Sequence, residues 1–276
     1  MEASHCMNKQ EILITGGDGV VGSYIDYGTR LSRSVLDVTD LVAVRETCRK
    51  QMPKVIIHLA AATDLVRCEK EPAYAYLVNA VGTYHVALVA REIGAKLIYV
   101  STSGVFDGSK VGPYVEKDVP NPVNTYGHSK YLGELAVVGL LSNYLIARTS
   151  WVFGGGRERD IKFVGKIMSQ LQSPEIKVVT DKQGSPTYAK DLARAIQKLM
   201  EEDRQGIVHL GGGLATRFEV AKEIISITGS ASSILPAVSN DFSSVYASGE
   251  NESMELSTYM RPWEESLREY IETEWQ

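Results

Sequence analysis

The sequence has few cysteines and no cluster of metal-ligating side chains. Its three cysteines, Cys6, Cys48 and Cys68, are scattered, with no Cys-x-x-Cys pair and no histidine cluster beside them. They therefore predict reduced thiols rather than a disulfide framework or a zinc site. Because no carboxylate cluster is present either, we expect no metal site.

The sequence also lacks a block of lysine and arginine and a long apolar run. With a formal net charge of -5, it has no surface suited to a polyanion, so nucleic acid is not an expected partner. No apolar run approaches the roughly 20 residues that cross a bilayer, and residues 1–10 lack the apolar stretch of a signal peptide. We expect a cytoplasmic protein without a membrane partner, with a flexible extension at residues 1–7.

What is present is an enzyme-sized chain of 276 residues, 44% of them hydrophobic, which is enough for a large core with a smaller appendage. Short apolar runs alternate with longer segments of helical pattern. The apolar runs are residues 11–15, 54–60, 96–100, 144–147 and 176–179, and the helical segments are residues 40–51, 71–93 and 125–141. Buried strands separated by helices predict a doubly wound α/β fold of the Rossmann type, with a parallel sheet.

The final third of the chain changes in character. An apolar run at residues 207–210 leads into three glycines, and Thr216-Arg-Phe-Glu219 has the pattern of a capping box that opens a helix. A last helix is expected at residues 261–270, with a proline in its first turn. Residues 229–255 are rich in Ser, Ala, Asn and Glu and predict loops over the carboxyl edge of the sheet.

These changes suggest two units. We expect a dinucleotide-binding domain at residues 8–152, to which residues 176–210 return. Residues 153–175 and 211–276 are expected to form a smaller C-terminal substrate-binding subdomain.

A glycine-rich turn follows the first predicted strand, with glycines at positions 16, 19 and 22 before a helix expected at residues 20–27. Gly16 permits a tight turn, Gly19 lets the backbone approach a pyrophosphate, and Gly22 allows close packing of the helix. The turn therefore predicts a dinucleotide site, which also includes Asp18, Val20 and Val21. A glycine turn without a ligand is the alternative.

The second strand, expected at residues 29–32, bears on the choice of cofactor. It does not end in the acidic residue that binds a ribose 2′-hydroxyl in sites selective for NAD. Arg30 and Ser32, with Arg33 and Ser34, can instead accept a 2′-phosphate. This favours NADP, with NAD as the alternative, unless the arginines are solvated surface charges.

Tyr126 and Lys130 lie four residues apart in a segment of helical pattern and would share one face of the helix. A nearby cation favours the phenolate and brings proton transfer closer to neutral pH. With 14 tyrosines in the chain, such a pair is also expected about once by chance. The alternative is therefore a surface helix with a solvated lysine.

In their order along the chain, several motifs resemble those of the extended short-chain dehydrogenase/reductases, and among these the dTDP-4-dehydrorhamnose reductases. The motifs are Gly16-x-x-Gly19-x-x-Gly22, Leu36-Asp-Val-Thr-Asp40, His58-Leu-Ala-Ala-Ala-Thr63, Val78-Asn79, Tyr99-Val-Ser-Thr102, Val105-Phe-Asp-Gly108, Tyr126-Gly-His-Ser-Lys130, Arg148-Thr-Ser-Trp-Val-Phe153, Gly184-Ser-Pro-Thr187 and Arg261-Pro-Trp-Glu-Glu265.

This resemblance implies an NAD(P)H-dependent oxidoreductase that reduces a 4-keto-6-deoxy nucleotide sugar. Thr102 would hydrogen-bond the keto oxygen, Tyr126 would be the general acid, and Lys130 would hold the nicotinamide ribose. A homodimer is compatible with this assignment.

The resemblance also implies further contacts. Cofactor contacts are expected at Asp37, Val38, Ala60, Ala61, Ala62 and Asn79, and substrate contacts at Thr63, Thr102, Ser103, Ser150 and Trp151. Simple packing is the alternative for the alanine run and for Trp151.

Two departures from the family pattern concern the substrate. Ser103-Gly104 stands where the family commonly has Asp-Tyr, and the segment Glu250 to Leu256 lacks an expected arginine. Two other functions stay open at this point: a nucleotide-sugar epimerase or dehydratase that retains NAD, and a non-catalytic NADP-binding subunit like the regulatory subunit of methionine adenosyltransferase.

Overall fold

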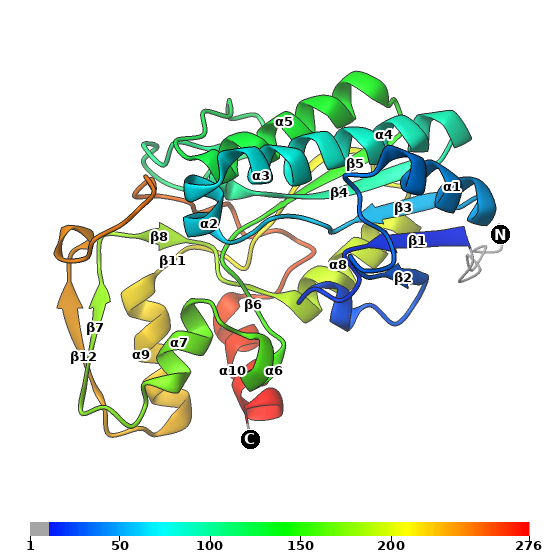
Figure 1. Ribbon diagram of the computed structural model, residues 1–276. Helices are drawn as coiled ribbons and strands as arrows, with labels where there is room; N and C mark the ends of the chain where they lie inside the picture. The colour runs from blue at the N-terminus through cyan, green and yellow to red at the C-terminus, as the bar shows by residue number, and fades with distance from the viewer. Residues whose placement is uncertain (1–10, 276) are drawn as a thin grey trace.

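The central element is a six-stranded sheet in which all paired strands are parallel, in the order β10-β5-β4-β3-β1-β2 (Figure 1). The computed structural model describes residues 11–275, so Cys6 and the expected extension at residues 1–7 lie outside the described part. The strands are β1 (Ile12–Thr15), β2 (Thr29–Leu31), β3 (Val55–His58), β4 (Lys96–Thr102), β5 (Tyr144–Thr149) and β10 (Gly206–Leu210). The predicted doubly wound α/β fold is confirmed.

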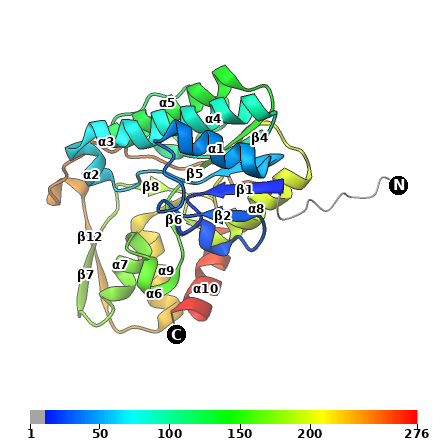
Figure 2. The ribbon, with the colours of Figure 1, turned by 45° about the vertical axis from the view of Figure 1, so that its right-hand side comes forward.

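Helices cover both faces of this sheet, as Figures 1 and 2 show. On one face lie α1 (Leu41–Gln51), α4 (Gly82–Ile93) and α5 (Thr125–Leu140), whose apolar residues pack with the sheet in one core. On the other face α8 (Ala189–Glu201) packs a second core against the same strands. Strands covered on both sides need apolar residues throughout, which is why their sequences read as continuous apolar runs.

The α-helix expected after the glycine turn is absent. Residues Gly22–Tyr24 form a single 3-10 turn, η2, and Ile25 is already extended. Gly28, with φ +73°, then turns the chain directly into β2. The segment between the glycine turn and the second strand is thus too short for the helix that the sequence predicted.

One long helical run lies over the sheet between β3 and β4. After α2 (Leu65–Lys70), the run consists of α3 (Pro72–Tyr76), a π-helical turn η3 (Leu77–Val81) and α4. Its length and composition would suffice to cross a bilayer, contrary to the expectation that no run comes near this length, but half of its most apolar window is buried inside the fold. Burial of this kind is typical of a core helix.

The second unit lies below the carboxyl edge of the sheet and has its own apolar core (Figure 1). Its strand pairs are β6 (Val152–Phe153) with β9 (Thr187–Tyr188), β7 (Glu175–Val179) with β12 (Ser233–Ala237), and β8 (Gln183–Gly184) with β11 (Ala215–Thr216). Its helices are α6 (Gly156–Arg159), α7 (Phe163–Ser169), α9 (Arg217–Thr228) and α10 (Trp263–Glu274), with a short turn η5 (Ser239–Asp241).

Two expectations about this unit have clear outcomes. The capping box is confirmed, because Thr216 and Glu219 exchange hydrogen bonds at the start of α9. The strand expected at residues 176–179 is present as β7, but it pairs with β12 outside the central sheet. The expected return of the chain at residue 176 therefore needs correction: only α8 and β10 rejoin the large domain.

Candidate active site

Thr102 and Tyr126 meet at the carboxyl edge of the central sheet. Thr102 is the last residue of β4, and its hydroxyl accepts a hydrogen bond from the Gly104 N–H at 3.0 Å, which begins the 3-10 turn η4 (Ser103–Val105). Tyr126 lies in the first turn of α5, where the Asn124 side chain caps the helix by accepting from the Gly127 N–H at 2.8 Å. Thr102 and Tyr126 lie close together, because a Cβ atom on Gly104 would be 3.3 Å from Thr102 Oγ1 and 3.7 Å from the Tyr126 ring.

The electrostatic setting of Tyr126 differs from the expected one. Burial raises the pKa of its phenol to about 12, and the nearby Thr102 hydroxyl lowers it only in part. Lys130 is not among the charges that act on it, whereas Glu252 raises the pKa further. Tyr126 is therefore a protonated phenol at neutral pH, and the expected lowering of its pKa by Lys130 is not observed.

Lys130 lies one turn further along α5 and points toward the sheet. Its ammonium group donates to the Val100 carbonyl at 2.8 Å and lies 4.1 Å from the ring centroid of Tyr99. Burial lowers the pKa of Lys130 to about 7, and Glu134 opposes this shift. Lys130 and Tyr126 are thus on one helix as predicted, but without a direct contact between their polar groups.

Asn79 joins three elements beneath the site. Its side-chain oxygen accepts from the Ala62 N–H at 2.8 Å, and its amide nitrogen donates to the Ala62 carbonyl and to Ser129 Oγ, both at 3.0 Å. The side chain is fully buried. Asn79 therefore fixes the end of β3 against α5, and both of the amide's polar atoms are used inside the protein.

The glycine turn forms a cradle of bare backbone beside β3. Gly16 has φ +66°, and a Cβ atom on it would lie 2.6 Å from the Ala60 nitrogen. A Cβ on Gly22 would lie 2.7 Å from the Gly17 carbonyl oxygen, so this glycine serves a close backbone approach within the turn rather than helix packing. Such a surface fits the pyrophosphate of a dinucleotide. Its backbone N–H groups would bind the phosphates without the additional favourable field that the N-terminus of a long helix supplies.

The remaining residues of the expected cofactor site lie around this turn. Asp18 and Gly19 are exposed at its tip, while the side chain of Val21 packs against the core. Ala60 and Ala61 are half-buried after β3, and Ala62 is buried. Val20 is half-buried, and its carbonyl accepts a hydrogen bond from Ser23.

Arg30 lies directly against the glycine turn. Its guanidinium donates to the Gly22 carbonyl at 3.1 Å, and a Cβ on Gly17 would lie 2.6 Å from the Arg30 Cβ. Ser32 shares a hydrogen bond of 2.8 Å with Ser34 at the end of β2. The residues that the sequence predicts for a 2′-phosphate therefore stand beside the cradle, on the exposed side of the sheet edge.

Arg33 is engaged elsewhere. It donates to the Tyr74 hydroxyl at 3.2 Å and lies 3.8 Å from the Asp37 carboxylate. Asp37 also accepts from the backbone and side chain of Thr39, which lowers the pKa of its carboxyl group. Val38 is buried, and its side chain lies against Gly82 of α4.

The expected substrate residues lie at or after the carboxyl ends of β3, β4 and β5. Ser103 donates to Ser150 Oγ at 2.9 Å, and Ser150 donates to the Glu252 carbonyl at 3.1 Å. Thr63 is exposed, and its carbonyl accepts from the Lys162 ammonium at 3.0 Å. Gly104 lies against both Thr102 and Tyr126, so a side chain on it would crowd these two residues.

Trp151 is held in an unusual conformation. Its φ of +40° is rare for a residue with a large side chain, and such strain persists only where the surroundings impose it. The indole Nε1 donates to Glu252 at 2.8 Å, and the ring packs so closely on Gly184 that a Cβ there would lie 2.2 Å away. The guanidinium of Arg217 lies 4.4 Å from the ring centroid.

Arg217 and Glu252 were missed by the sequence predictions. Arg217 stands inside the Thr216 to Glu219 capping box, which indicates only where a helix begins. Glu252 stands in a segment that predicts loops, and nothing in the sequence points it toward Trp151. Their contacts join segments that are far apart along the chain, so local pattern has no signal for them.

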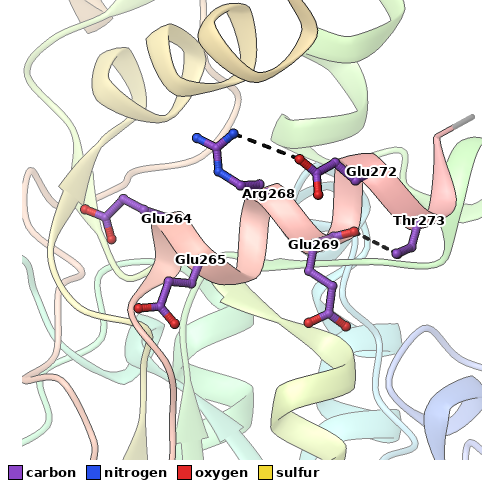
Figure 3. A pocket seen from close by; sticks show the side chains of 6 residues that line it. All are labelled: Glu264, Glu265, Arg268, Glu269, Glu272 and Thr273. Atoms are coloured by element: carbon purple, nitrogen blue, oxygen red, sulfur yellow. Dashed lines mark hydrogen bonds and ion pairs between the residues drawn. The ribbon is translucent and has the colours of Figure 1, made fainter.

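A hollow along α10 is a separate surface feature. Its volume is about 360 Å³. The residues that line it, shown in Figure 3, are Glu264, Glu265, Arg268, Glu269, Glu272 and Thr273. Arg268 pairs with Glu223 of α9 at 2.9 Å, and Glu269 pairs with Lys190 of α8 at 2.8 Å. These ion pairs attach α10 to its neighbours. Among residues 11–275 no group of three or more His, Cys, Asp or Glu side chains is arranged to hold a metal.

Comparisons with known proteins agree with this geometry. A family model described as RmlD substrate binding domain matches residues 10–275. The chain is 33% identical to the spore coat polysaccharide biosynthesis protein SpsK of Bacillus subtilis, over 95% of this chain and 97% of that protein. It is also 33% identical to a dTDP-4-keto-6-deoxy-D-glucose reductase of Streptomyces niveus, over 79% of this chain and 78% of that protein.

The fold also matches a solved structure along nearly its whole length. A crystal structure of dTDP-4-dehydrorhamnose reductase from Bacillus anthracis, in complex with NADP, superposes with a TM-score of 0.91 at 34% identity. The match covers 97% of this chain and 100% of that chain.

Proposed function

The chain belongs to the RmlD substrate binding domain family, and on this premise we propose that it is an NADPH-dependent reductase of a 4-keto-6-deoxy nucleotide sugar. The observation that carries the proposal is the position of Thr102 and Tyr126, which lie close together beside Gly104 at the carboxyl edge of the sheet. Open α/β sheets bind their ligands at this edge. The Streptomyces niveus and Bacillus anthracis relatives support both the reaction and the sugar class.

In the proposed reaction a bound nicotinamide supplies the hydride that adds to the C4 carbonyl carbon. Negative charge then develops on the carbonyl oxygen, where the hydroxyl groups of Thr102 and Tyr126 stabilise it. Tyr126 gives its proton to this oxygen, and the resulting phenolate regains a proton from solvent. The raised pKa of Tyr126, about 12, keeps the phenol protonated and ready to donate at neutral pH.

We assign Lys130 to the cofactor side of the same site. Its ammonium lies within the protein against the Val100 carbonyl and the Tyr99 ring, one helical turn from Tyr126. From there it would bind a hydroxyl of the nicotinamide ribose. The bare backbone of the glycine turn would hold the pyrophosphate, and Arg30 would bind the 2′-phosphate that distinguishes NADP from NAD.

The contacts with substrate are proposed for Thr63, Ser103, Ser150 and Trp151. Thr63 lies in the segment after β3, and Trp151 lies shortly after β5. The glycine at position 104 keeps side-chain atoms away from the Thr102 hydroxyl and the Tyr126 ring, which a larger residue would crowd. The substrate is therefore proposed as a class of 4-keto-6-deoxy nucleotide sugars rather than as one compound.

The test is NADPH oxidation with dTDP-, UDP-, GDP- and CDP-linked 4-keto-6-deoxy sugars. We expect turnover with at least one of them, and a kcat about 10²- to 10⁴-fold lower in Tyr126→Phe, with NADPH affinity nearly unchanged. Tyr84→Phe, on the exposed side of α4, is the matched control and keeps full activity. Full activity of Tyr126→Phe would contradict the assigned role of the phenol.

Two alternatives have distinct outcomes in the same assay. An epimerase or dehydratase would convert sugar without net consumption of NADPH and would retain NAD through turnover. A non-catalytic NADP-binding subunit would bind NADPH but oxidise none with any sugar. Location in the cytoplasm, assembly as a homodimer and the lack of nucleic acid and membrane partners remain predictions, to be tested by fractionation and by light scattering.

A further inference from the structure

Arg217 is a partly buried cation without a bonded anion. Its guanidinium carbon lies 4.4 Å from the ring centroid of Trp151 and 4.7 Å from that of Phe163. Within residues 11–275 no hydrogen bond or ion pair to its guanidinium group is found, although its backbone N–H donates to the Lys182 carbonyl at 3.2 Å. A desolvated guanidinium is costly unless its donors are used, and two aromatic contacts satisfy none of them.

Other partly or fully buried arginines of the chain are paired. Arg148 makes two hydrogen bonds to Glu134, at 2.7 and 2.9 Å. Arg261 is joined to Asp191 by a hydrogen bond of 2.8 Å and to Glu269 at 2.7 Å. The comparison indicates that Arg217 is held in place by packing while its donors stay free for a group from outside the chain.

The position of Arg217 places it beside the proposed site of reduction. It stands at the start of α9, and its partner Phe163 stands at the start of α7; these two helices lie side by side in Figures 1 and 2. Glu252 acts electrostatically on both Arg217 and Tyr126, so the three groups share one region. Tyr246 also acts on the guanidinium.

A second cation accompanies Arg217 on the same side. Lys162, next to Phe163 in sequence, extends its ammonium to the Thr63 carbonyl at the end of β3. The Glu252 carboxylate offsets part of this positive charge, but one of its oxygens accepts from the Trp151 indole.

We propose that Arg217 binds the diphosphate of the nucleotide-sugar substrate, with Trp151 and Phe163 fixing its guanidinium for that contact. This inference rests on the proposed function, because it identifies the part of the substrate that the residues around Trp151 recognise. A keto sugar positioned at Tyr126 must extend its diphosphate away from the reacting carbon, past Trp151. A planar guanidinium binds phosphate oxygens through two parallel hydrogen bonds, which a point charge cannot do.

The experiment compares ligands that differ only in phosphate. Wild type, Arg217→Met, Arg217→Lys and Arg194→Met are titrated calorimetrically with dTDP, UDP, thymidine and uridine. Methionine keeps the apolar stem that packs on Trp151 but removes the charge. Arg194 is the matched control, since it is an exposed arginine on α8, 62% exposed, and lies outside the proposed site.

Of dTDP and UDP, one will bind wild type more tightly. We expect Arg217→Met to weaken the binding of that diphosphate about 10- to 100-fold, since a charged hydrogen-bonded contact is lost. Binding of the nucleosides and of NADPH should change little, and Arg217→Lys should lie between wild type and Arg217→Met. A purely structural role of Arg217 would instead lower the affinity for nucleoside and nucleoside diphosphate together. In turnover, the loss should fall on KM more than on kcat.

Two results would overturn the inference: equal affinity of wild type and Arg217→Met for the diphosphate, or no binding of either diphosphate by wild type. Neither depends on catalysis. The proposed function fails separately, if wild type binds the diphosphates but oxidises NADPH with none of the four sugar classes.

Discussion

Gly127 of α5 lies directly on the Gly104 carbonyl oxygen, so close that a Cβ atom on Gly127 would be 1.9 Å away. This contact sets the first turn of α5 against η4, the turn that follows Thr102. Because Tyr126 is the neighbour of Gly127, the same contact determines how near the phenol comes to the Thr102 hydroxyl. A glycine is required here for the approach of two backbone segments.

Gly127→Ala should therefore separate Tyr126 from Thr102. The added methyl group must displace backbone, which destabilises the fold by about 1–3 kcal/mol or more and lowers kcat in the variant that still folds. Gly139→Ala is the control on the same helix, because nothing lies within 4 Å of its Cβ and alanine stabilises helices by up to about 1 kcal/mol. Chemical denaturation and NADPH oxidation measure the two effects, and equal behaviour of the variants would contradict the expectation.

The buried Lys130 should make stability depend on pH in the alkaline range. Its pKa is about 7 in the folded chain and about 10.4 when unfolded, so between these values the unfolded chain binds more protons. The free energy of unfolding of wild type should thus rise with pH across this window. Relative to Lys130→Met, the rise should be on the order of 4 kcal/mol. Urea denaturation of both proteins from pH 7 to 10 measures this rise. A difference in unfolding free energy that stays constant over this range would argue against a buried lysine with a lowered pKa.

The ion pair between Arg148 and Glu134 joins β5 to α5 inside the core, with both side chains at most 3% exposed. Removing one partner leaves a buried charge, so Glu134→Leu or Arg148→Met should cost about 3–5 kcal/mol of stability. The double variant Arg148→Met/Glu134→Leu should recover most of this loss, because no charge then stays buried. Thermal and urea unfolding of the four proteins complete the cycle. Additive losses would show that the pair does not act as a unit.

Arg30 should determine the preference for NADPH. Its guanidinium stands at the glycine turn, whereas Arg33 is engaged with Tyr74 and Asp37. Arg30→Ala should weaken NADPH binding about 10- to 100-fold by removing a phosphate contact, and should change NADH binding little. Arg33→Ala is the matched control, with a smaller effect on NADPH. Fluorescence titration with NADPH and NADH gives the ratio of their dissociation constants. If this ratio is unchanged in Arg30→Ala, other residues bind the 2′-phosphate.

Local pattern predicted the elements well where one segment carries its own signal. The apolar runs became β1, β3, β4 and β5, and the Thr216 to Glu219 pattern became a capped helix. The same kind of signal failed after the glycine turn, where the helix at residues 20–27 is reduced to η2. There Gly28 turns the chain into β2 too early, and the apolar residues Val21 and Ile25 serve the core without helical periodicity.

The sequence by itself determined the class of fold, the order of the dinucleotide turn and the helix with Tyr126 and Lys130, because these depend on spacing within short segments. Only the tertiary structure decided that the Lys130 ammonium binds Val100 rather than the phenol, and that β7 leaves the central sheet. It alone brought Arg217 onto Trp151. These are contacts between distant segments, whose partners are chosen by burial and packing of the whole chain and not by any local pattern.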